Sequence, residues 1–136
     1  MKIFRLSLQS TYAESEKVPD FVSDIQNEIG LDEAIAGKLM LILSEAATNA
    51  IVHGNELDES KKVDIELQFG PKKITAIVKD EGQGFDPESS TDDPLAEENL
   101  LKAGGRGVFL IKKLADNVEF SDGGTKVKFE IWLNSN

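Results

Sequence analysis

Apolar and polar residues alternate in five parts of the chain, with the spacing typical of half-buried β-strands. The predicted strands are residues 2–9, 63–69, 74–79, 118–120 and 125–133. A short turn that contains glycine joins the second strand to the third, and another joins the fourth to the fifth. These two pairs are therefore predicted to be β-hairpins. Trp132 falls on the face of the last strand opposite its apolar residues, where it is expected to be a surface aromatic or part of a protein interface.

Three other segments place their apolar residues at the three- and four-residue spacing of helices. They are residues 12–29, 32–52 and 107–115. Pro19 falls near the first turn of the main part of the first helix, where proline is tolerated. In the second helix, Asp32 provides an N-terminal cap, and Gly54 with Asn55 provides a stop.

The order of elements is strand, helix, helix, hairpin, loop, helix, hairpin. Because strands and helices do not alternate regularly, the predicted class is α+β, with a mostly antiparallel mixed sheet and helices on one face. Residues 86–103 are polar, contain two prolines and are predicted to form a mobile loop that acts as a lid. No segment has the composition of an interdomain linker, and residues 1–136 are expected to form one domain.

The chain has a formal net charge of −10, and 40% of its residues are apolar. The apolar share is that of a globular protein, whereas the acidity argues against nucleic acid as a partner. Without cysteine, disulfides and thiolate metal sites cannot form, so a reducing, cytoplasmic location is expected. The N-terminus lacks the apolar core of a signal peptide. No apolar stretch approaches the roughly 20 residues that cross a bilayer, so no membrane association is expected.

Glu45 and Asn49 form the first candidate motif. They lie four residues apart in the second predicted helix and therefore share one of its faces. A carboxylate beside an amide oxygen suits a base next to a ligand for a divalent cation. In isolation such a pair is more typical of a solvent-facing polar stripe, but here Ala46, Ala47 and Ala50 surround it with apolar surface.

Two glycine-rich segments carry the other motifs. Asp80 ends a predicted strand and is followed by Gly82 and Gly84. An aspartate there can accept a hydrogen bond from an exocyclic amine such as that of adenine, and the glycines let the backbone approach a flat base. Residues 104–107, Gly-Gly-Arg-Gly, lead into a helix, whose free N–H groups and dipole can hold phosphate. Each segment alone is also consistent with an ordinary glycine turn.

Together and in this order, the motifs resemble the nucleotide-binding boxes of the GHKL (Bergerat-fold, histidine-kinase-like) ATPase superfamily. Within it, the chain is similar to the small bacterial anti-sigma factor serine kinases. The resemblance spans nearly the whole chain. Residues 43–54 resemble the asparagine box of that family, 80–87 its first glycine box, 93–101 its lid, 105–111 its second glycine box and 123–125 its terminal box.

The resemblance implies a role for each matching residue. Glu45 would be the general base on a substrate serine, Asn49 would bind Mg²⁺, and Asp80 would recognise adenine. The implied nucleotide-binding residues are Asn49, Asp80, Gly82, Gly84, Gly105, Arg106, Gly107, Val108 and Thr125. The implied cofactors are ATP and Mg²⁺. The implied partners are a sigma factor and a STAS-domain anti-anti-sigma protein, and the chain would form a homodimer.

Three functions remain open at this point. The first is an ATP-dependent protein serine kinase that acts as an anti-sigma regulatory factor, and the presence of Glu45 favours it. The second is a non-catalytic nucleotide-binding switch protein in a partner-switching pathway, and relatives that regulate a phosphatase share much of the pattern. The third is the ATP-binding domain of a histidine-kinase pathway. Phe109 counts against the third, because sensor histidine kinases usually have glycine there, and His53, the only histidine, is expected to be structural.

Overall fold

The computed structural model describes residues 1–82 and 105–133, which form one five-stranded sheet in the order β1-β2-β3-β5-β4. The strands are β1 (Lys2–Gln9), β2 (Lys62–Phe69), β3 (Lys73–Lys79), β4 (Asn117–Ser121) and β5 (Lys126–Trp132). All four neighbouring pairs are antiparallel. The five predicted strands and both hairpins are confirmed. The sheet was predicted to be mostly antiparallel and mixed, and among the described strands it contains no parallel pair.

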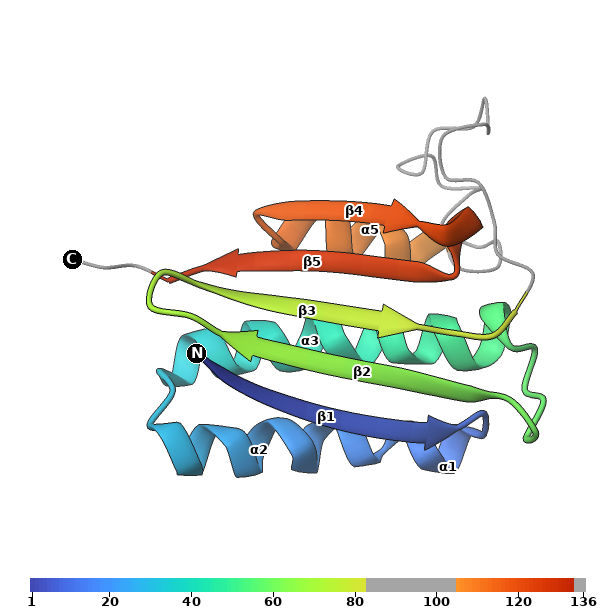
Figure 1. Ribbon diagram of the computed structural model, residues 1–136, viewed down its shortest axis with the longest axis horizontal. Helices are drawn as coiled ribbons and strands as arrows, with labels where there is room; N and C mark the ends of the chain where they lie inside the picture. The colour runs from blue at the N-terminus through green and yellow to red at the C-terminus, as the bar shows by residue number, and fades with distance from the viewer. Residues whose placement is uncertain (83–104, 134–136) are drawn as a thin grey trace.

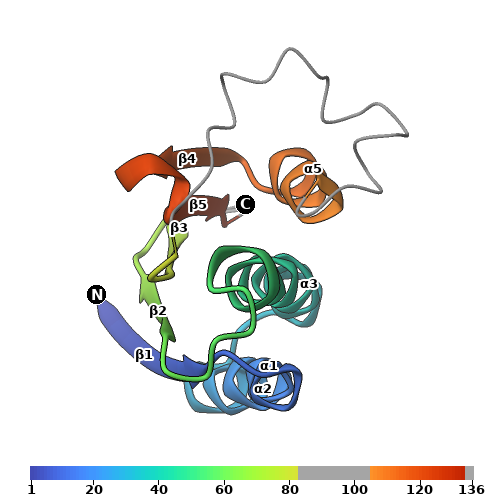
Figure 2. The same cartoon turned by 90° about the vertical axis from the view of Figure 1, so that its right-hand side faces the viewer.

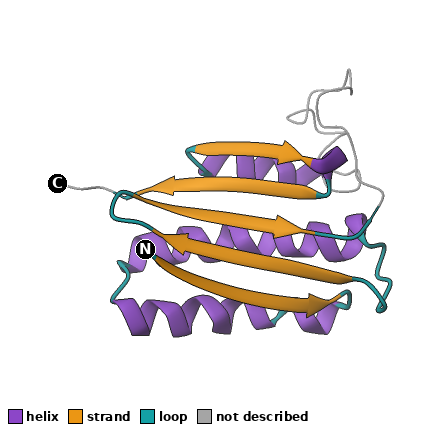
Figure 3. Cartoon of the chain, viewed as in Figure 1, coloured by secondary structure: helices purple, strands orange, loops and turns teal. Residues whose placement is uncertain are grey.

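The helices lie on one face of this sheet, as predicted (Figure 1). They are α1 (Tyr12–Ser15), α2 (Lys17–Ile29), α3 (Glu33–Asn49) and α5 (Gly105–Leu114). Viewed end on, α2, α3 and α5 line one side of the sheet, and none of these helices covers the other side (Figure 2). The predicted α+β class is therefore confirmed, as a layer of helices packed on a layer of strands (Figure 3).

The second predicted helix has two parts. Asp32 caps α3 as predicted, because its Oδ2 accepts the N–H groups of Ala34 and Ile35 at 3.1 and 3.3 Å. After Asn49 the coil widens into a π-helical turn, η1 (Ala50–Gly54). Turns of this kind are rare and are frequent at functional sites.

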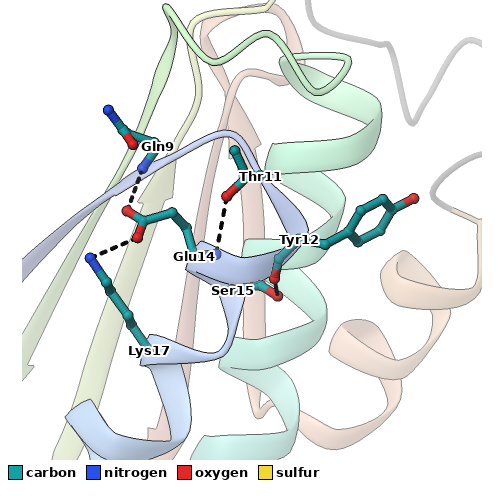
Figure 4. A network of polar contacts seen from close by, with 6 residues as sticks. All are labelled: Gln9, Thr11, Tyr12, Glu14, Ser15 and Lys17. Atoms are coloured by element: carbon teal, nitrogen blue, oxygen red, sulfur yellow. Dashed lines mark hydrogen bonds and ion pairs between the residues drawn. The ribbon is translucent and has the colours of Figure 1, made fainter.

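The first predicted helix is split into α1 and α2 by a network around Glu14 (Figure 4). Thr11 Oγ1 accepts the Glu14 N–H at 3.2 Å and caps α1. The Glu14 carboxylate accepts the N–H of Gln9 at 3.0 Å and pairs with Lys17 at 2.7 Å. The hydrogen bond from Lys17, followed by that from Gln9, lowers the pKa of Glu14. Pro19 lies in the first turn of α2, as predicted.

The hydrophobic core lies between the sheet and α3. Phe4 on β1 and Phe69 on β2 pack against each other in a T-shaped contact, with their ring centroids 5.6 Å apart. The largest fully buried side chains are Phe129, Leu8, Leu39, Ile42, Leu43, Ile51, Ile65, Leu67, Ile74, Ile111, Ile131 and Val18. They come from every described strand except β4 and from α2, α3, η1 and α5, so a single core joins both ends of the sequence.

The helical run Glu33–Gly54 has 22 residues and contains an 18-residue window with a mean hydropathy of 1.4, so by length and composition alone it could cross a membrane. The expectation that no stretch approaches this length was therefore wrong. The fold accounts for the apolarity, because α3 is the central helix of the core and packs against α2 on one side and α5 on the other. Leu39, Ile42 and Leu43 on this run are completely buried.

Phe129→Ala should lower the free energy of unfolding by about 3–5 kcal/mol, because it removes a fully buried ring and leaves a cavity. Trp132→Ala is the matched control on the other face of β5. Trp132 is 57% exposed, so its loss should change stability by only about 0.5 kcal/mol. Urea denaturation followed by circular dichroism measures both variants. Equal losses would contradict this placement of the core.

Candidate functional site

The elements that carry the candidate motifs meet at one end of the molecule. α3 with η1 and β3 end there, and α5 begins there, on the right-hand side of Figure 1. The start of β5 lies at the same place, because Lys126 is the register partner of Lys79 at the end of β3. Four segments that are distant in sequence therefore border one region.

Glu45 and Asn49 lie one helical turn apart near the end of α3, and both are half-buried. Ala46, Ala47 and Ala50 around them are buried. The pair therefore borders the core, and the apolar surroundings expected from the sequence are confirmed. His53 lies further along in η1 and is exposed.

Asp80 follows the last residue of β3 and is buried, with 9% of its surface exposed. Its main-chain N–H donates to the carbonyl oxygen of Thr125 at 2.8 Å, which continues the pairing of β3 with β5 by one residue. Its Oδ1 accepts the N–H of Gly82 at 2.8 Å. The main chain of Asp80 is thus fixed by Thr125, and its carboxylate is fixed by Gly82.

Two glycines make room for this carboxylate. A Cβ atom on Gly54 would lie 2.4 Å from Oδ2 of Asp80. A Cβ atom on Gly82 would lie 1.8 Å from the carbonyl oxygen of Gly54. A larger residue at position 54 would displace the Asp80 carboxylate, and one at position 82 would require the backbone to move, so η1 and the turn after β3 pack directly on each other.

Burial raises the pKa of the Asp80 carboxyl above its ordinary value of 3.8. The hydrogen bond from Gly82 and the charge of Lys61 oppose this rise in part. A buried carboxylate favours a further hydrogen-bond donor brought by a ligand. This arrangement suits the exocyclic amine that the sequence motif predicts.

The remaining predicted site residues fall into three groups. Thr125 lies beside Asp80, but its hydroxyl donates to the carbonyl oxygen of Asp122 at 2.8 Å and so is already engaged. The backbone of residues 105–108 forms the first turn of α5, which begins two residues earlier than predicted. The four leading N–H groups of a helix have no partner within it, which suits phosphate. The predicted site residue Gly84 and the predicted lid, residues 86–103, lie outside the described residues.

Sequence reasoning treated Asn55 only as part of a helix stop and gave Gly54 no role beyond that stop and the end of the asparagine box, so it missed the contacts that both residues make in this region. Asn55 is completely buried. Its Oδ1 accepts the N–H of Glu81, the residue after Asp80, at 2.8 Å. The pairing joins residues 26 positions apart, so no local pattern signals it.

The described residues fit a magnesium ion held chiefly by a nucleotide. In residues 1–82 and 105–133, no group of three carboxylate, histidine or cysteine side chains is arranged to hold a metal. Asn49, the predicted magnesium ligand, carries one amide oxygen and lies half-buried at the end of α3. Mg²⁺ is commonly bound by one or two protein oxygens together with the phosphates of its substrate, and this donor set matches that pattern.

Comparison with known proteins places these features in a family. Residues 8–131 match the model of the histidine kinase-like ATPase domain. An anti-sigma F factor of Clostridium perfringens is 35% identical over 97 residues, which cover 68% of this chain and 69% of that protein. The serine-protein kinase RsbW of Bacillus subtilis is 29% identical over 119 residues, 83% of this chain and 74% of that protein.

A similar fold occurs in the crystal structure of the RsbU and RsbW domains of a Mycobacterium tuberculosis protein. The TM-score is 0.67 at 16% sequence identity, and the match covers 97% of this chain and 32% of the other. At this identity the likeness concerns the fold alone. It agrees with the antiparallel sheet and the helical layer described above.

Asp80→Asn should leave the free energy of unfolding at pH 7 unchanged or higher, because it removes a charge from a buried position while Oδ1 can still accept the Gly82 N–H. A carboxyl whose pKa is higher in the folded state binds its proton more tightly there. Wild type should therefore gain stability relative to the variant as pH falls through the window between 3.8 and the raised pKa. Denaturation curves of both proteins across that window measure the difference. A relative loss of wild-type stability on acidification would contradict the raised pKa.

Proposed function

The chain belongs to the histidine kinase-like ATPase domain family and, within it, to the anti-sigma factor serine kinases, and on that basis we propose that it is an ATP-dependent protein serine kinase that acts as an anti-sigma regulatory factor. Its substrate is a serine of a STAS-domain anti-anti-sigma protein, and it sequesters a sigma factor. The observation that carries the nucleotide part is the buried Asp80 carboxylate, held by Gly82 and packed against Gly54.

The nucleotide is held at both of its ends. Asp80 accepts a hydrogen bond from the adenine amine, and Gly82, Gly84 and Thr125 lie around the base. Gly105, Arg106, Gly107 and Val108 begin α5, and their N–H groups with the Arg106 charge hold the phosphates. Asn49 would contribute its amide oxygen to Mg²⁺, and the ion would supply the neutralisation of phosphate charge that such reactions need.

Phosphoryl transfer needs mainly positioning and charge stabilisation. The serine hydroxyl oxygen of the substrate attacks the γ-phosphorus of ATP. The bond from that phosphorus to the β–γ bridging oxygen breaks, so ADP leaves. Glu45 accepts the hydroxyl proton. Its half-buried place next to Asn49 keeps base and magnesium ligand on one helix face.

The proposal also covers the domain organisation, location, oligomeric state and partners of the protein. Residues 1–136 act as one domain, in the cytoplasm and as a homodimer. The acidic charge of −10 favours a protein partner over nucleic acid. The alternative is a nucleotide-binding switch protein that exchanges partners without phosphoryl transfer. Labelled ATP incubated with candidate STAS proteins distinguishes the two, because only the kinase transfers label to serine.

Asp80→Asn should weaken ATP binding roughly tenfold to a hundredfold, the usual range for a hydrogen bond to a charged group. Asp64→Asn is the matched control, because Asp64 is exposed on β2. Isothermal titration calorimetry with Mg²⁺ measures both variants and wild type. Undiminished affinity in Asp80→Asn would remove Asp80 from base recognition, and a wild type without affinity for ATP would overturn the proposed function.

Glu45→Gln should slow phosphoryl transfer to the STAS substrate by about 10²–10⁴-fold, because the amide cannot accept the serine proton. ATP affinity should stay within about twofold, since Glu45 is not proposed to touch the nucleotide. Glu33→Gln at the exposed start of the same helix serves as control. Single-turnover transfer and ATP titration are measured side by side. An active Glu45→Gln enzyme would show that another group is the base.

A further inference from the structure

Asn55 is the centre of a buried hydrogen-bond network beside the candidate site. The residue is completely buried, although asparagine is usually exposed. Its Nδ2 donates to Ser10 Oγ at 2.9 Å and to the carbonyl oxygen of Lys62 at 3.1 Å. Its Oδ1 accepts the N–H of Glu81 at 2.8 Å. The amide thus contacts three other segments of the chain.

The partners of Asn55 are themselves fixed. Ser10 is completely buried, and its hydroxyl donates to the carbonyl oxygen of Lys61 at 2.7 Å. The N–H of Lys62 donates to the Glu81 carboxylate. The network therefore ties the end of β1, the end of η1, the start of β2 and the turn after β3 into one unit.

The backbone immediately after Asn55 is strained. Glu56 and Leu57 have φ angles of 53° and 60°, a left-handed conformation that costs about 1–2 kcal/mol per residue that is not glycine. The Leu57 N–H donates to the carbonyl oxygen of Ile51 at 2.9 Å, and this hydrogen bond holds the chain after Asn55 against η1. Such strain persists only where surrounding contacts determine the conformation, and it gathers at functional sites.

Asn55 acts where the turn after β3 approaches η1 most closely through Gly82 and Gly54. Glu81 lies between Asp80 and Gly82, and Gly82 approaches Gly54 so closely that a Cβ would meet backbone at 1.8 Å. Holding the Glu81 N–H sets the position of the peptide group that joins Asp80 to Glu81. A small shift of this peptide moves the Asp80 carboxylate.

We propose that Asn55 is a positioning residue for base recognition, acting through Glu81 to hold the Asp80 carboxylate where it accepts the adenine amine. Asn55 itself touches no nucleotide. This inference rests on the proposed function, because it assumes that Asp80 recognises adenine. It adds a residue outside the motif to those that determine which base is bound.

A positioning role for Asn55 affects the discrimination between adenine and guanine, whereas a purely structural role affects only the stability of the fold. Adenine presents an amine donor where guanine presents a carbonyl acceptor, so a fixed carboxylate favours ATP over GTP. A carboxylate free to move discriminates less. A residue that only stabilises the fold would lower the folded fraction, and this affects the measured affinity for both nucleotides equally. The ratio of the two dissociation constants is therefore the diagnostic quantity.

The test uses Asn55→Ala, Ser10→Ala and Phe129→Leu. Asn55→Ala removes all three hydrogen bonds of the amide, whereas Ser10→Ala removes only one of the two acceptors of its Nδ2 group. Phe129→Leu lowers stability in the core, away from the site, and is the control. ATP and GTP affinities are measured by calorimetry with Mg²⁺, and folded fractions by circular dichroism.

The GTP-to-ATP ratio of dissociation constants should fall about tenfold in Asn55→Ala and roughly twofold to fivefold in Ser10→Ala, and it should not change in Phe129→Leu. If Asn55→Ala does not fold, the Ser10→Ala result decides. An unchanged ratio in folded variants overturns the positioning role while leaving ATP recognition intact. A wild type with no preference for ATP overturns the proposed function, and the positioning role with it.

Discussion

The fold at this end of the molecule depends on one constraint, which is that a buried carboxylate must be held between two closely packed pieces of backbone. Asp80 receives the Gly82 N–H, and its other oxygen lies over Gly54. Burial raises its pKa, so keeping this carboxyl ionised lowers the stability of the folded protein. A ligand that donates a hydrogen bond recovers part of that loss. The site is thus poised for a donor before any ligand arrives.

The helical layer also helps to build this site. α3 supplies the central wall of the core and also carries Glu45 and Asn49 to the border of the site. The run that begins with α3 is long and apolar enough to span a membrane, but its apolar residues pack against the sheet and the neighbouring helices. The π-helical turn that follows brings Gly54 onto Asp80 and turns Asn55 inward. Core packing and site geometry are therefore linked through a single continuous helix.

Much of the fold followed from sequence patterns because those patterns are local. Alternation along β2 and β3, the helical spacing in α3 and the Asp32 cap each involve residues within a few positions of one another, and each element formed as predicted. The order of the motifs indicated the family, and the match over residues 8–131 agrees with it. The roles assigned to Glu45, Asn49 and the start of α5 stay predictions. Residues 83–104, with Gly84 and the predicted lid, lie outside the described residues.

The sequence by itself determined the elements, the class of fold and the family, since periodicity, caps and motif spacing are properties of neighbouring residues. Only the tertiary structure decided how the site is assembled. Asn55 meets Ser10 across 45 residues and Glu81 across 26. The close approach of Gly82 to Gly54 and the left-handed turn at Glu56 and Leu57 exist only once η1 has packed against the end of β3. Such contacts depend on which surfaces the core brings together, and no local pattern encodes them.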